Sequence, residues 1–428
     1  MKRFDWSALD AAGRRAALAR PRERRDAAVT DTVRRIFEEV ETEGVAAVRR
    51  WSERLDGRAP ETLRLDGATV DRARAALDPA DLASLDLAVA NVRAYHEATK
   101  PAEAVVETHP GVRCRRVWRA IRRCGLYVPG GTAPLFSTLV MLAVPAAVAG
   151  VAEPVAVTPP VRGEGVHPMM IAAAAACGLE RLELVGGAQA VAALAFGAGL
   201  PRVDKIFGPG NAYVAEAKRY AAELPGGPAQ DLPAGPSELM VVADETADPV
   251  LVAADLLSQA EHDADAQVVL IATSNPSVSA ILAELERQLA GLPREAIARR
   301  SLAEARAILV GDLGEAAEAA DAYAPEHLSI QTGDPGRLVE RIRNAGTVFV
   351  GPWAAETLGD YVSGPSHVLP TDGAARTWSG VGVASFMTSF AVQEVDREGA
   401  RLLAPAAARL ARLEGLEAHA RAADLRVA

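Results

Sequence analysis

A repeated strand–turn–helix rhythm constrains the fold of this chain more than any other feature of its sequence. From about residue 122, short apolar runs of strand length alternate with helical runs. The apolar runs are Cys124–Val128, Pro154–Thr158, Leu182–Val185 and Lys205–Phe207. The helical runs that follow them are Ser137–Ala149, Pro168–Cys177, Ala188–Phe196 and Ala212–Ala222. This alternation predicts a parallel sheet with crossover helices, because parallel neighbours need long connections.

The same rhythm starts again after the turn-rich segment 231–236. Its runs of strand length are Leu239–Ala243, Gln267–Thr273, Ala307–Val310, Leu328–Ile330 and Thr347–Val350. Helices such as Val278–Leu289 and Pro335–Asn344 lie between them. The sequence therefore predicts two α/β units in series, residues 122–236 and 237–380, with a crevice between them.

The flanking regions have a different character. Residues 1–121 are predicted to be mostly helical, with helices over Asp31–Glu43, Val45–Leu55 and Asp81–Thr99. A hairpin-like pair of strands is expected around His109, and the later part of this region is expected to pack on the second unit. Residues 381–428 are predicted to form a helical tail rich in Ala, Leu and Arg, whose charged residues suggest packing on another subunit.

Length and charge limit the classes of function. The chain has 428 residues and a formal net charge of -10. That length suits two or more domains, and the negative charge argues against nucleic acid or an anionic membrane as a partner. The arginine-rich stretch 113–123 is interpreted as a solvated strand face. Three cysteines without a CxxC pair, and a start without an apolar signal core, predict a cytoplasmic protein.

The segment Ser258–Asp265 combines groups that can bind a metal. It closes an apolar helical run for which Asp248 is the expected N-cap. In a helix, Asp255, Gln259 and His262 share one face, away from the core stripe. An acidic helix end with a solvated histidine is the alternative interpretation of this segment on its own.

Two glycine turns resemble nucleotide-binding loops. Gly125–Thr132 has the spacing of a phosphate-binding loop, but Gly131 stands where the lysine of that motif is required. Gly208–Tyr213 follows a strand and opens a helix, with Tyr213 in place of the third glycine of a dinucleotide fingerprint. Either turn could place backbone N–H groups against a pyrophosphate. Plain tight turns are the alternative.

Several segments taken together resemble the histidinol dehydrogenase family. They are Gly125–Gly131, Gly208–Asn211, Pro233–Glu238, Ser258–Asp263, Ala324–Leu328, Asp360–Tyr361, Gly364–Pro370 and Glu414–Leu416 with His419. These segments follow one another in order over nearly the whole chain. The resemblance implies a zinc-dependent homodimer of two incomplete Rossmann-like parallel-sheet domains with helical N-terminal and C-terminal elements. It also implies oxidation of L-histidinol to L-histidine with two NAD, through a bound L-histidinaldehyde.

The resemblance further implies roles for individual residues. The implied zinc ligands are Gln259, His262, Asp360 and His419, the last supplied by the partner subunit. Glu326 and His327 would carry the proton transfers. The implied NAD contacts are Tyr127, Gln189 and Asn211. The implied substrate contacts are Ser237, His327, His367 and Glu414, together with the zinc-ligand side chains; Glu414 is also supplied in trans.

These residue types suit such an oxidation. The imidazole of His327 can act as a base near neutral pH, and Glu326 can activate the water that hydrates an aldehyde. The hydride must go to a nicotinamide, because no side chain can accept it. One conflict remains: Gln259 and His262 fall at a helix end opposite the carboxyl ends of the strands, where ligands usually bind.

Two other classes of protein fit parts of the pattern. A zinc hydrolase of a small amine or amide would use His262, Asp360 and His419 for the metal and Glu326 for water activation. The absence of an HExxH motif counts against it. A two-domain solute-binding protein would explain the paired α/β units, but such a protein normally carries a secretion signal.

Overall fold

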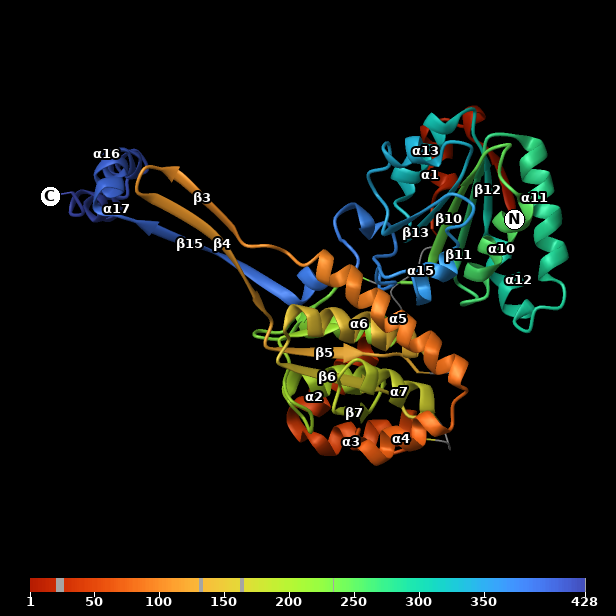
Figure 1. Ribbon diagram of the computed structural model, residues 1–428, viewed down its shortest axis with the longest axis horizontal. Helices are drawn as coiled ribbons and strands as arrows, with labels where there is room; N and C mark the ends of the chain where they lie inside the picture. The colour runs from red at the N-terminus through yellow and green to blue at the C-terminus, as the bar shows by residue number, and fades with distance from the viewer. Residues whose placement is uncertain (21–26, 131–133, 162–164, 234, 428) are drawn as a thin grey trace.

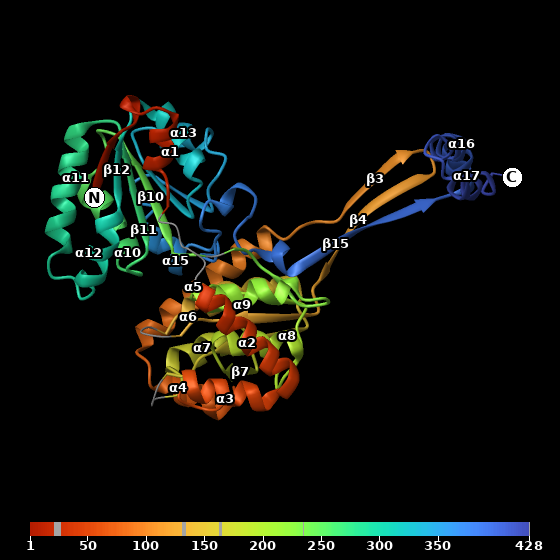
Figure 2. The ribbon, with the colours of Figure 1, turned by 180° about the vertical axis from the view of Figure 1, so that it is seen from behind.

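The computed structural model describes residues 1–20, 27–130, 134–161, 165–233 and 235–427. Two α/β units lie next to each other, and a narrow arm projects from them (Figures 1 and 2). The C-terminus lies at the far end of the arm, whereas the N-terminus lies in the unit formed by the later strands. Among the described helices, none is long and apolar enough to cross a membrane.

The first sheet has the strand order β2-β7-β6-β5-β8-β9. Its strands are β2 (Glu61–Arg64), β5 (Arg123–Tyr127), β6 (Glu153–Thr158), β7 (Arg181–Leu184), β8 (Lys205–Phe207) and β9 (Ala229–Gln230). Strands β5 to β9 are parallel, and β2 pairs antiparallel at the edge. Numbered from β5, the parallel strands run 3-2-1-4-5, which is the order of a dinucleotide-binding sheet without its sixth strand.

Helices cover both faces of this sheet. One apolar core includes α5 (Pro79–Ala98), α6 (Phe136–Ala149) and α7 (Pro168–Ala176), with α4 (Gly67–Ala75) against α7. The core on the other face includes α2 (Ala27–Glu43), α3 (Val45–Leu55), α8 (Gly187–Phe196) and α9 (Ala212–Glu223). Because both faces are shielded from water, the strands read as continuous apolar runs.

The second sheet has the order β1-β12-β11-β10-β13-β14 and is parallel throughout. Its strands are β1 (Lys2–Asp5), β10 (Glu238–Ala243), β11 (Gln267–Ala272), β12 (Arg306–Leu309), β13 (His327–Gln331) and β14 (Thr347–Val350). One core includes α10 (Pro249–Ala260), α11 (Asn275–Leu289) and α12 (Glu295–Glu304). The other includes α13 (Leu313–Tyr323) and α14 (Pro335–Val339), and α1 (Ala11–Ala17) lies near α13 (Figure 1). Counted from β10, this sheet repeats the 3-2-1-4-5 order of the first.

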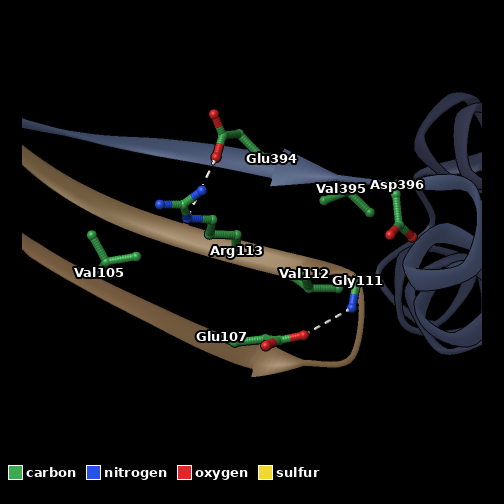
Figure 3. Close-up of a pocket in the computed structure, with 8 residues that line it drawn as sticks. All are labelled: Val105, Glu107, Gly111, Val112, Arg113, Glu394, Val395 and Asp396. Carbon is green, nitrogen blue, oxygen red and sulfur yellow. Dashed lines mark hydrogen bonds and ion pairs between the residues drawn. The ribbon is translucent and has the colours of Figure 1, made fainter.

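The arm is a three-stranded antiparallel sheet that carries two helices. Its strands are β3 (Ala104–His109), β4 (Val112–Ala120) and β15 (Met387–Val395), in the order β15-β4-β3. The helices are α16 (Arg397–Leu413) and α17 (Glu417–Asp424). Near the helices the arm holds a hollow of about 630 Å³, bordered by Glu107, Arg113 and Glu394 among others (Figure 3).

The prediction of two parallel α/β units is confirmed, and so is the hairpin around His109. The helix expected over Pro335–Asn344 is shorter, because α14 ends at Val339. Oδ1 of Asp321 accepts hydrogen bonds from the backbone N–H groups of Arg343 (2.8 Å) and Asn344. These bonds hold the segment outside the helix.

The prediction that residues 381–428 are helical is wrong in its first part. Met387–Val395 form strand β15, whose residues pair with β4 from Met387 opposite Ala120 to Val395 opposite Val112. Most residues of β15 are exposed on both faces of the arm. Because neither face is buried, its sequence does not show the alternation of apolar and polar residues that marks a half-buried strand. The pairing comes from a partner strand far away in the sequence.

The first 121 residues divide between the two units. The beginning of the chain joins the second sheet as β1, which pairs with β12. The later helix α5 packs mainly on α6. It meets the second unit through Asn91, whose Nδ2 donates to the carbonyl oxygen of Val362 at 2.9 Å.

The buried His96 of α5 makes stability sensitive to acid. Neither ring nitrogen has a hydrogen-bond partner among the described residues, and the side chain is 1% exposed. Burial lowers the pKa of His96 to about 4. An unfolded chain takes up this proton near pH 6.5, so the folded state loses stability as the pH falls from about 6.5 to about 4.

We therefore expect His96→Leu to flatten the pH dependence of the free energy of unfolding between pH 6.5 and 4. The difference from the unsubstituted protein should reach about 3 kcal/mol at the acid end. Urea unfolding at several pH values measures it, with the exposed His109→Leu as control. Parallel curves for the unsubstituted protein and His96→Leu would contradict this expectation.

Candidate active site

The predicted catalytic residues lie at the amino-terminal edge of the second sheet. In the parallel pair β10–β13, Leu239 lies opposite His327, so Glu238 and Glu326 come together one position earlier. Helix α10 runs back across the sheet and brings its C-terminal end, with Gln259, to the same edge. The helix end therefore does reach the candidate site, because the site lies at the amino ends of the strands rather than at the usual carboxyl ends.

His327 is placed as a base. Its Nδ1 lies 3.1 Å from the carbonyl oxygen of Glu238, which assigns the ring proton to Nδ1 because a carbonyl can only accept. Its Nε2 is buried without a hydrogen-bond partner in the described residues, 3.9 Å from Oδ1 of Asp360. Burial lowers the pKa of His327 to about 3. The ring is therefore neutral, with a free lone pair on Nε2.

Buried carboxyl groups surround this imidazole. Oε2 of Glu326 accepts a hydrogen bond from the backbone N–H of Glu238 at 2.8 Å. Oε1 of Glu356 lies 3.3 Å from Nδ1 of His327, and its Oε2 accepts from Ser258 Oγ at 3.2 Å. Burial raises the pKa of Glu326 and the pKa of Glu356 well above the ordinary value. Carboxyl groups crowded in this way favour a bound cation or their own protonation.

Two of the predicted metal ligands, Asp360 and His262, lie near His327, and Gln259 stands at the end of α10 that reaches the same edge. Gln259 is fully buried, and neither atom of its amide has a partner within the described residues. Burial raises the pKa of Asp360 to about 6, and the nearby His262 opposes this effect. An unpaired amide, a carboxylate and an imidazole together fit a zinc ion. In the described part of the chain, no three His, Cys, Asp or Glu side chains form a metal site, so the predicted zinc site stays a prediction.

His367 joins the two units at this site. Its Nδ1 lies 2.8 Å from the carbonyl oxygen of Asp360, and its Nε2 lies 3.2 Å from Oγ1 of Thr138 in α6. Because α6 follows β5, this contact brings the carboxyl edge of the first sheet against the amino edge of the second. Ser237, half-buried, precedes β10 at the same edge.

The structure does not bring the two predicted tail residues to this site within one chain. Glu414 and His419 are exposed at the end of α16 and in α17. Both helices lie at the far end of the arm, away from β10, β13 and α15 (Glu356–Tyr361) (Figure 1).

The predicted NAD contacts lie at the carboxyl edge of the first sheet. Tyr127 ends β5, and its hydroxyl accepts a hydrogen bond from the N–H of Gly187 at 3.0 Å. Gln189 is fully buried, and its Nε2 donates to Oδ2 of Asp56 at 3.1 Å. Asn211 caps the neighbouring helix α9 through its Oδ1. Tyr127 and Gln189 therefore meet around Gly187, while Asn211 is exposed one loop away.

A buried ion pair holds the loop before Asn211. Nζ of Lys218 donates to the carbonyl oxygen of Gly208 at 2.7 Å and pairs with Asp231. Oδ2 of Asp231 accepts from the N–H of Gly208, also at 2.7 Å. Gly208 has φ +116, and a Cβ there would lie 2.0 Å from the carbonyl oxygen of Tyr127. Only glycine allows the loop to approach β5 this closely. Gly131 of the other glycine turn lies outside the described residues.

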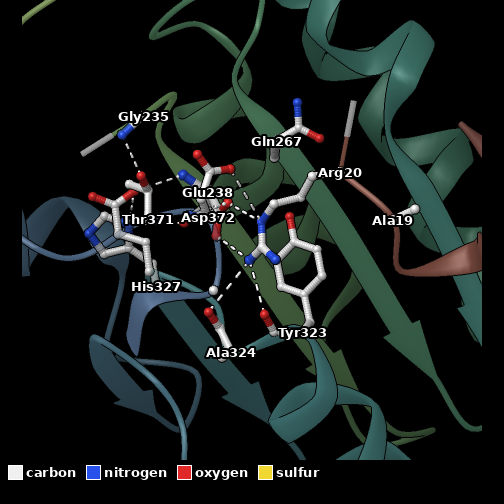
Figure 4. Close-up of polar contacts among 12 residues, drawn as sticks. Ala19, Arg20, Gly235, Glu238, Gln267, Tyr323, Ala324, His327, Thr371 and Asp372 are labelled. Atoms are coloured by element: carbon white, nitrogen blue, oxygen red, sulfur yellow. Dashed lines mark hydrogen bonds and ion pairs between the residues drawn. The ribbon is translucent and has the colours of Figure 1, made fainter. Parts of the chain in front are cut away.

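Sequence reasoning missed several residues around the candidate site. Glu356 had one available signal, since it precedes Asp360 by four positions and so shares its face of α15. Glu238 ends one of the segments that carry the family resemblance, but no role was predicted for it, because a carboxylate at the start of an apolar strand is ambiguous. Arg20, which pairs with Glu238 (Figure 4), comes from a segment remote in the sequence.

Comparisons with known proteins agree over the whole chain. Residues 19–427 match the family model of histidinol dehydrogenase. The chain is 46% identical to the histidinol dehydrogenase of Xanthomonas axonopodis pv. citri (strain 306), over 100% of this chain and 99% of that relative. The chain belongs to the histidinol dehydrogenase family. It is also 43% identical to the histidinol dehydrogenase of Vibrio parahaemolyticus serotype O3:K6 (strain RIMD 2210633), over 100% of this chain and 98% of the relative.

The fold agrees with that of a solved family member. The crystal structure of histidinol dehydrogenase from Elizabethkingia anophelis superimposes with a TM-score of 0.95 at 36% identity, covering 100% of this chain and 98% of that chain. The resemblance found in the sequence is therefore confirmed, as is the predicted fold class. As a member of the histidinol dehydrogenase family, the chain is an oxidoreductase of histidine biosynthesis.

The ion pair behind the Gly208 loop leads to a stability prediction. We expect Lys218→Met to lower the free energy of unfolding by about 3–5 kcal/mol, because it leaves the buried Asp231 carboxylate unpaired. The double variant Lys218→Met with Asp231→Asn should lose clearly less. Urea unfolding compares them, with Lys100→Met as a control at an exposed lysine that also donates to a backbone carbonyl. Equal losses in the single and double variants would show that the charge pairing is not the cause.

Proposed function

We propose that this chain oxidises L-histidinol to L-histidine with two NAD, at the edge where His327 and Glu326 lie. The observation that carries the proposal is the free, buried Nε2 of the neutral His327, 3.9 Å from Asp360, with Glu326 on the Nδ1 side of the same ring. Membership of the histidinol dehydrogenase family supports the substrate. The names of the relatives point to histidinol as the substrate. The site supplies a base for the first oxidation and a water-activating carboxyl group for the second.

The two oxidations use these groups in turn. In the first, Nε2 of His327 accepts the proton of the substrate hydroxyl while a hydride leaves its carbon for the nicotinamide of NAD. In the second, Glu326, kept ionised by the cation that such crowded carboxyl groups favour, accepts a proton from the water that adds to the aldehyde carbon, and the hydrate loses a second hydride to a second NAD. Burial keeps His327 neutral and excludes bulk water from the reactive aldehyde.

Zinc fits the remaining donors of the site. Gln259, His262 and Asp360 would hold the ion, with the partner subunit's His419 as the fourth ligand. When bound, zinc would fix the imidazole and amino nitrogens of histidinol next to His327. Ser237 and His367 line the same edge, and the partner subunit's Glu414 would complete the substrate site.

NAD is assigned to the opposing edge of the first sheet. Tyr127 and Gln189 lie around Gly187 there, and the N-terminus of α9 begins at Asn211. Backbone N–H groups at a helix N-terminus favour a pyrophosphate. The Thr138–His367 contact supports this arrangement, because it joins this edge to the one that carries His327.

Completion of the site requires a homodimer in this proposal. Exposed leucines on helix α16 support a partner for that surface, including Leu410 (62% exposed) and Leu413 (77%). His419 is exposed in its own chain and lies at the end of the arm, where it can reach a second copy. The free cysteines Cys114, Cys124 and Cys177 are compatible with work in the reducing cytoplasm.

The direct test incubates the purified protein with zinc, NAD and L-histidinol while the absorbance of reduced nicotinamide is followed. Two equivalents of reduced NAD should form for each L-histidine. A chain that releases no reduced NAD, or that hydrolyses small amides without NAD, would refute the proposal.

We expect His327→Asn to slow the oxidation by roughly 10²–10⁴-fold, as loss of a general base should. The zinc content should stay unchanged, because His327 is not assigned as a ligand. Steady-state rates and metal analysis of the same preparation give both results. Loss of zinc together with activity would make His327 a ligand and overturn its role as the base.

A mixed dimer tests the tail exchange. His262→Ala and His419→Ala should each be inactive as homodimers. In a heterodimer with exchanged tails, one site has all its ligands and the other lacks both histidines, so activity should return to roughly half that of the unsubstituted dimer. Co-expression with two different tags isolates the heterodimer for assay. If it is inactive and poor in zinc, each tail completes the site of its own chain.

A further inference from the structure

A buried ion pair lies directly behind the edge that carries the predicted catalytic residues (Figure 4). The guanidinium of Arg20 makes a two-pronged contact with the carboxylate of Glu238, through Nε and, at 2.7 Å, through Nη2. Glu238 is fully buried. Oε1 of Glu238 also accepts from the backbone N–H of Asp372 at 3.0 Å. The side chain of Glu238 is thus held from two sides.

The backbone of Glu238 contacts both predicted catalytic residues. Its N–H donates to Oε2 of Glu326 at 2.8 Å. Its carbonyl oxygen accepts from Nδ1 of His327 at 3.1 Å. One residue therefore sets the orientation of the carboxyl group, and it also sets which nitrogen of the imidazole keeps the proton. The free Nε2 of His327 depends on this second contact.

Arg20 also holds the segment that leads into Glu326. Its guanidinium lies over the ring of Tyr323 at 3.7 Å from the ring centre, and Nη2 donates to the carbonyl oxygen of Tyr323 at 3.0 Å. The next residue, Ala324, is fully buried and has φ +54, an unfavourable backbone conformation for a residue other than glycine. Arg20 thus connects the start of β10 to the strained turn from which Glu326 extends.

We propose that Arg20 and Glu238 are positioning residues for the oxidation. Their ion pair fixes the backbone of Glu238 against the turn at Ala324, and this backbone orients Glu326 and the Nδ1-protonated form of His327. The proposal rests on the proposed function for its kinetic part. Neither residue touches the reacting atoms. Both act through Glu326 and His327.

The test removes both charges together, because a single substitution leaves a buried charge unpaired and can unfold the protein. The double variant is Arg20→Met with Glu238→Gln. We expect a folded, dimeric protein with unchanged zinc content and a KM for histidinol within about twofold of the original. Its kcat should fall by roughly 10- to 100-fold, the usual cost of displacing groups by a fraction of an ångström. Arg20→Lys keeps the positive charge but loses the two-pronged contact, so its kcat should lie between those of the original protein and the double variant.

Arg376→Met is the matched control. Arg376 lies close to Arg20 and donates to the carbonyl oxygens of Gly373 and Ala322, but the described contacts do not join it to Glu238. Its kcat should stay within about twofold of the original. A folded double variant with the kcat of this control would overturn the positioning role.

A second measurement does not depend on activity. Nitrogen-15 NMR of labelled histidine reports which ring nitrogen is protonated, and His327→Asn identifies the signal. The unsubstituted protein should show the Nδ1-protonated form, and the double variant should show a mixture of both forms. If the unsubstituted protein fails to oxidise histidinol, the proposed function fails. If the tautomer of His327 is the same in both proteins, the positioning inference fails, whatever the activity.

Discussion

The contact between Thr138 and His367 decides which edges of the two sheets face each other. His367 donates from Nδ1 to the backbone carbonyl of Asp360, which leaves Nε2 to accept from the Thr138 hydroxyl. Thr138 belongs to the carboxyl edge of the first sheet, and Asp360 belongs to the amino edge of the second. The edge of the first sheet at which such folds usually bind ligands therefore lies against the amino edge of the second sheet. This explains why the candidate catalytic residues begin their strands rather than end them.

Both edges are stabilised in the same physical way. Behind the first, Lys218 and Asp231 clamp the backbone of Gly208; behind the second, Arg20 and Glu238 fix the backbone that Glu326 and His327 contact. A buried ion pair is a poor source of net stability, because desolvation offsets most of its attraction. Such a pair does, however, favour one geometry, because separating the two charges would leave each of them buried without a partner. Loops that must hold a ligand or a proton in one place benefit from that specificity.

The sequence predicts the regular parts of this fold well, because their causes are local. Apolar runs, capping residues such as Asp248 and glycine stops mark β5 to β8 and β10 to β14 within a few residues, whereas the two-residue strand β9 was not predicted. Strand β15 was missed because its only reason to be extended is its pairing with β4. Gln259, His262 and Asp360 were identified by resemblance to a family, and their role as metal ligands stays a prediction.

The residues that sequence reasoning could not find are those whose function depends on distant partners. Arg20 shows no pattern in its own segment, and its meaning appears only when the chain brings it against Glu238.

The shape of the chain itself favours a shared site. The arm carries α16 and α17 away from both units, so Glu414 and His419 cannot approach Gln259 while β15 stays paired with β4 (Figure 1). Meanwhile Gln259 is buried with both amide atoms unpaired, and an unpaired buried amide costs free energy unless a ligand satisfies it. A single chain thus leaves two features unsatisfied: apolar leucines exposed to water at the end of the arm, and an unpaired buried amide at the edge of the second sheet. In the proposed dimer, a second copy with its tail over this edge would cover the leucines and bring the remaining ligand, so dimer and metal site would stabilise each other.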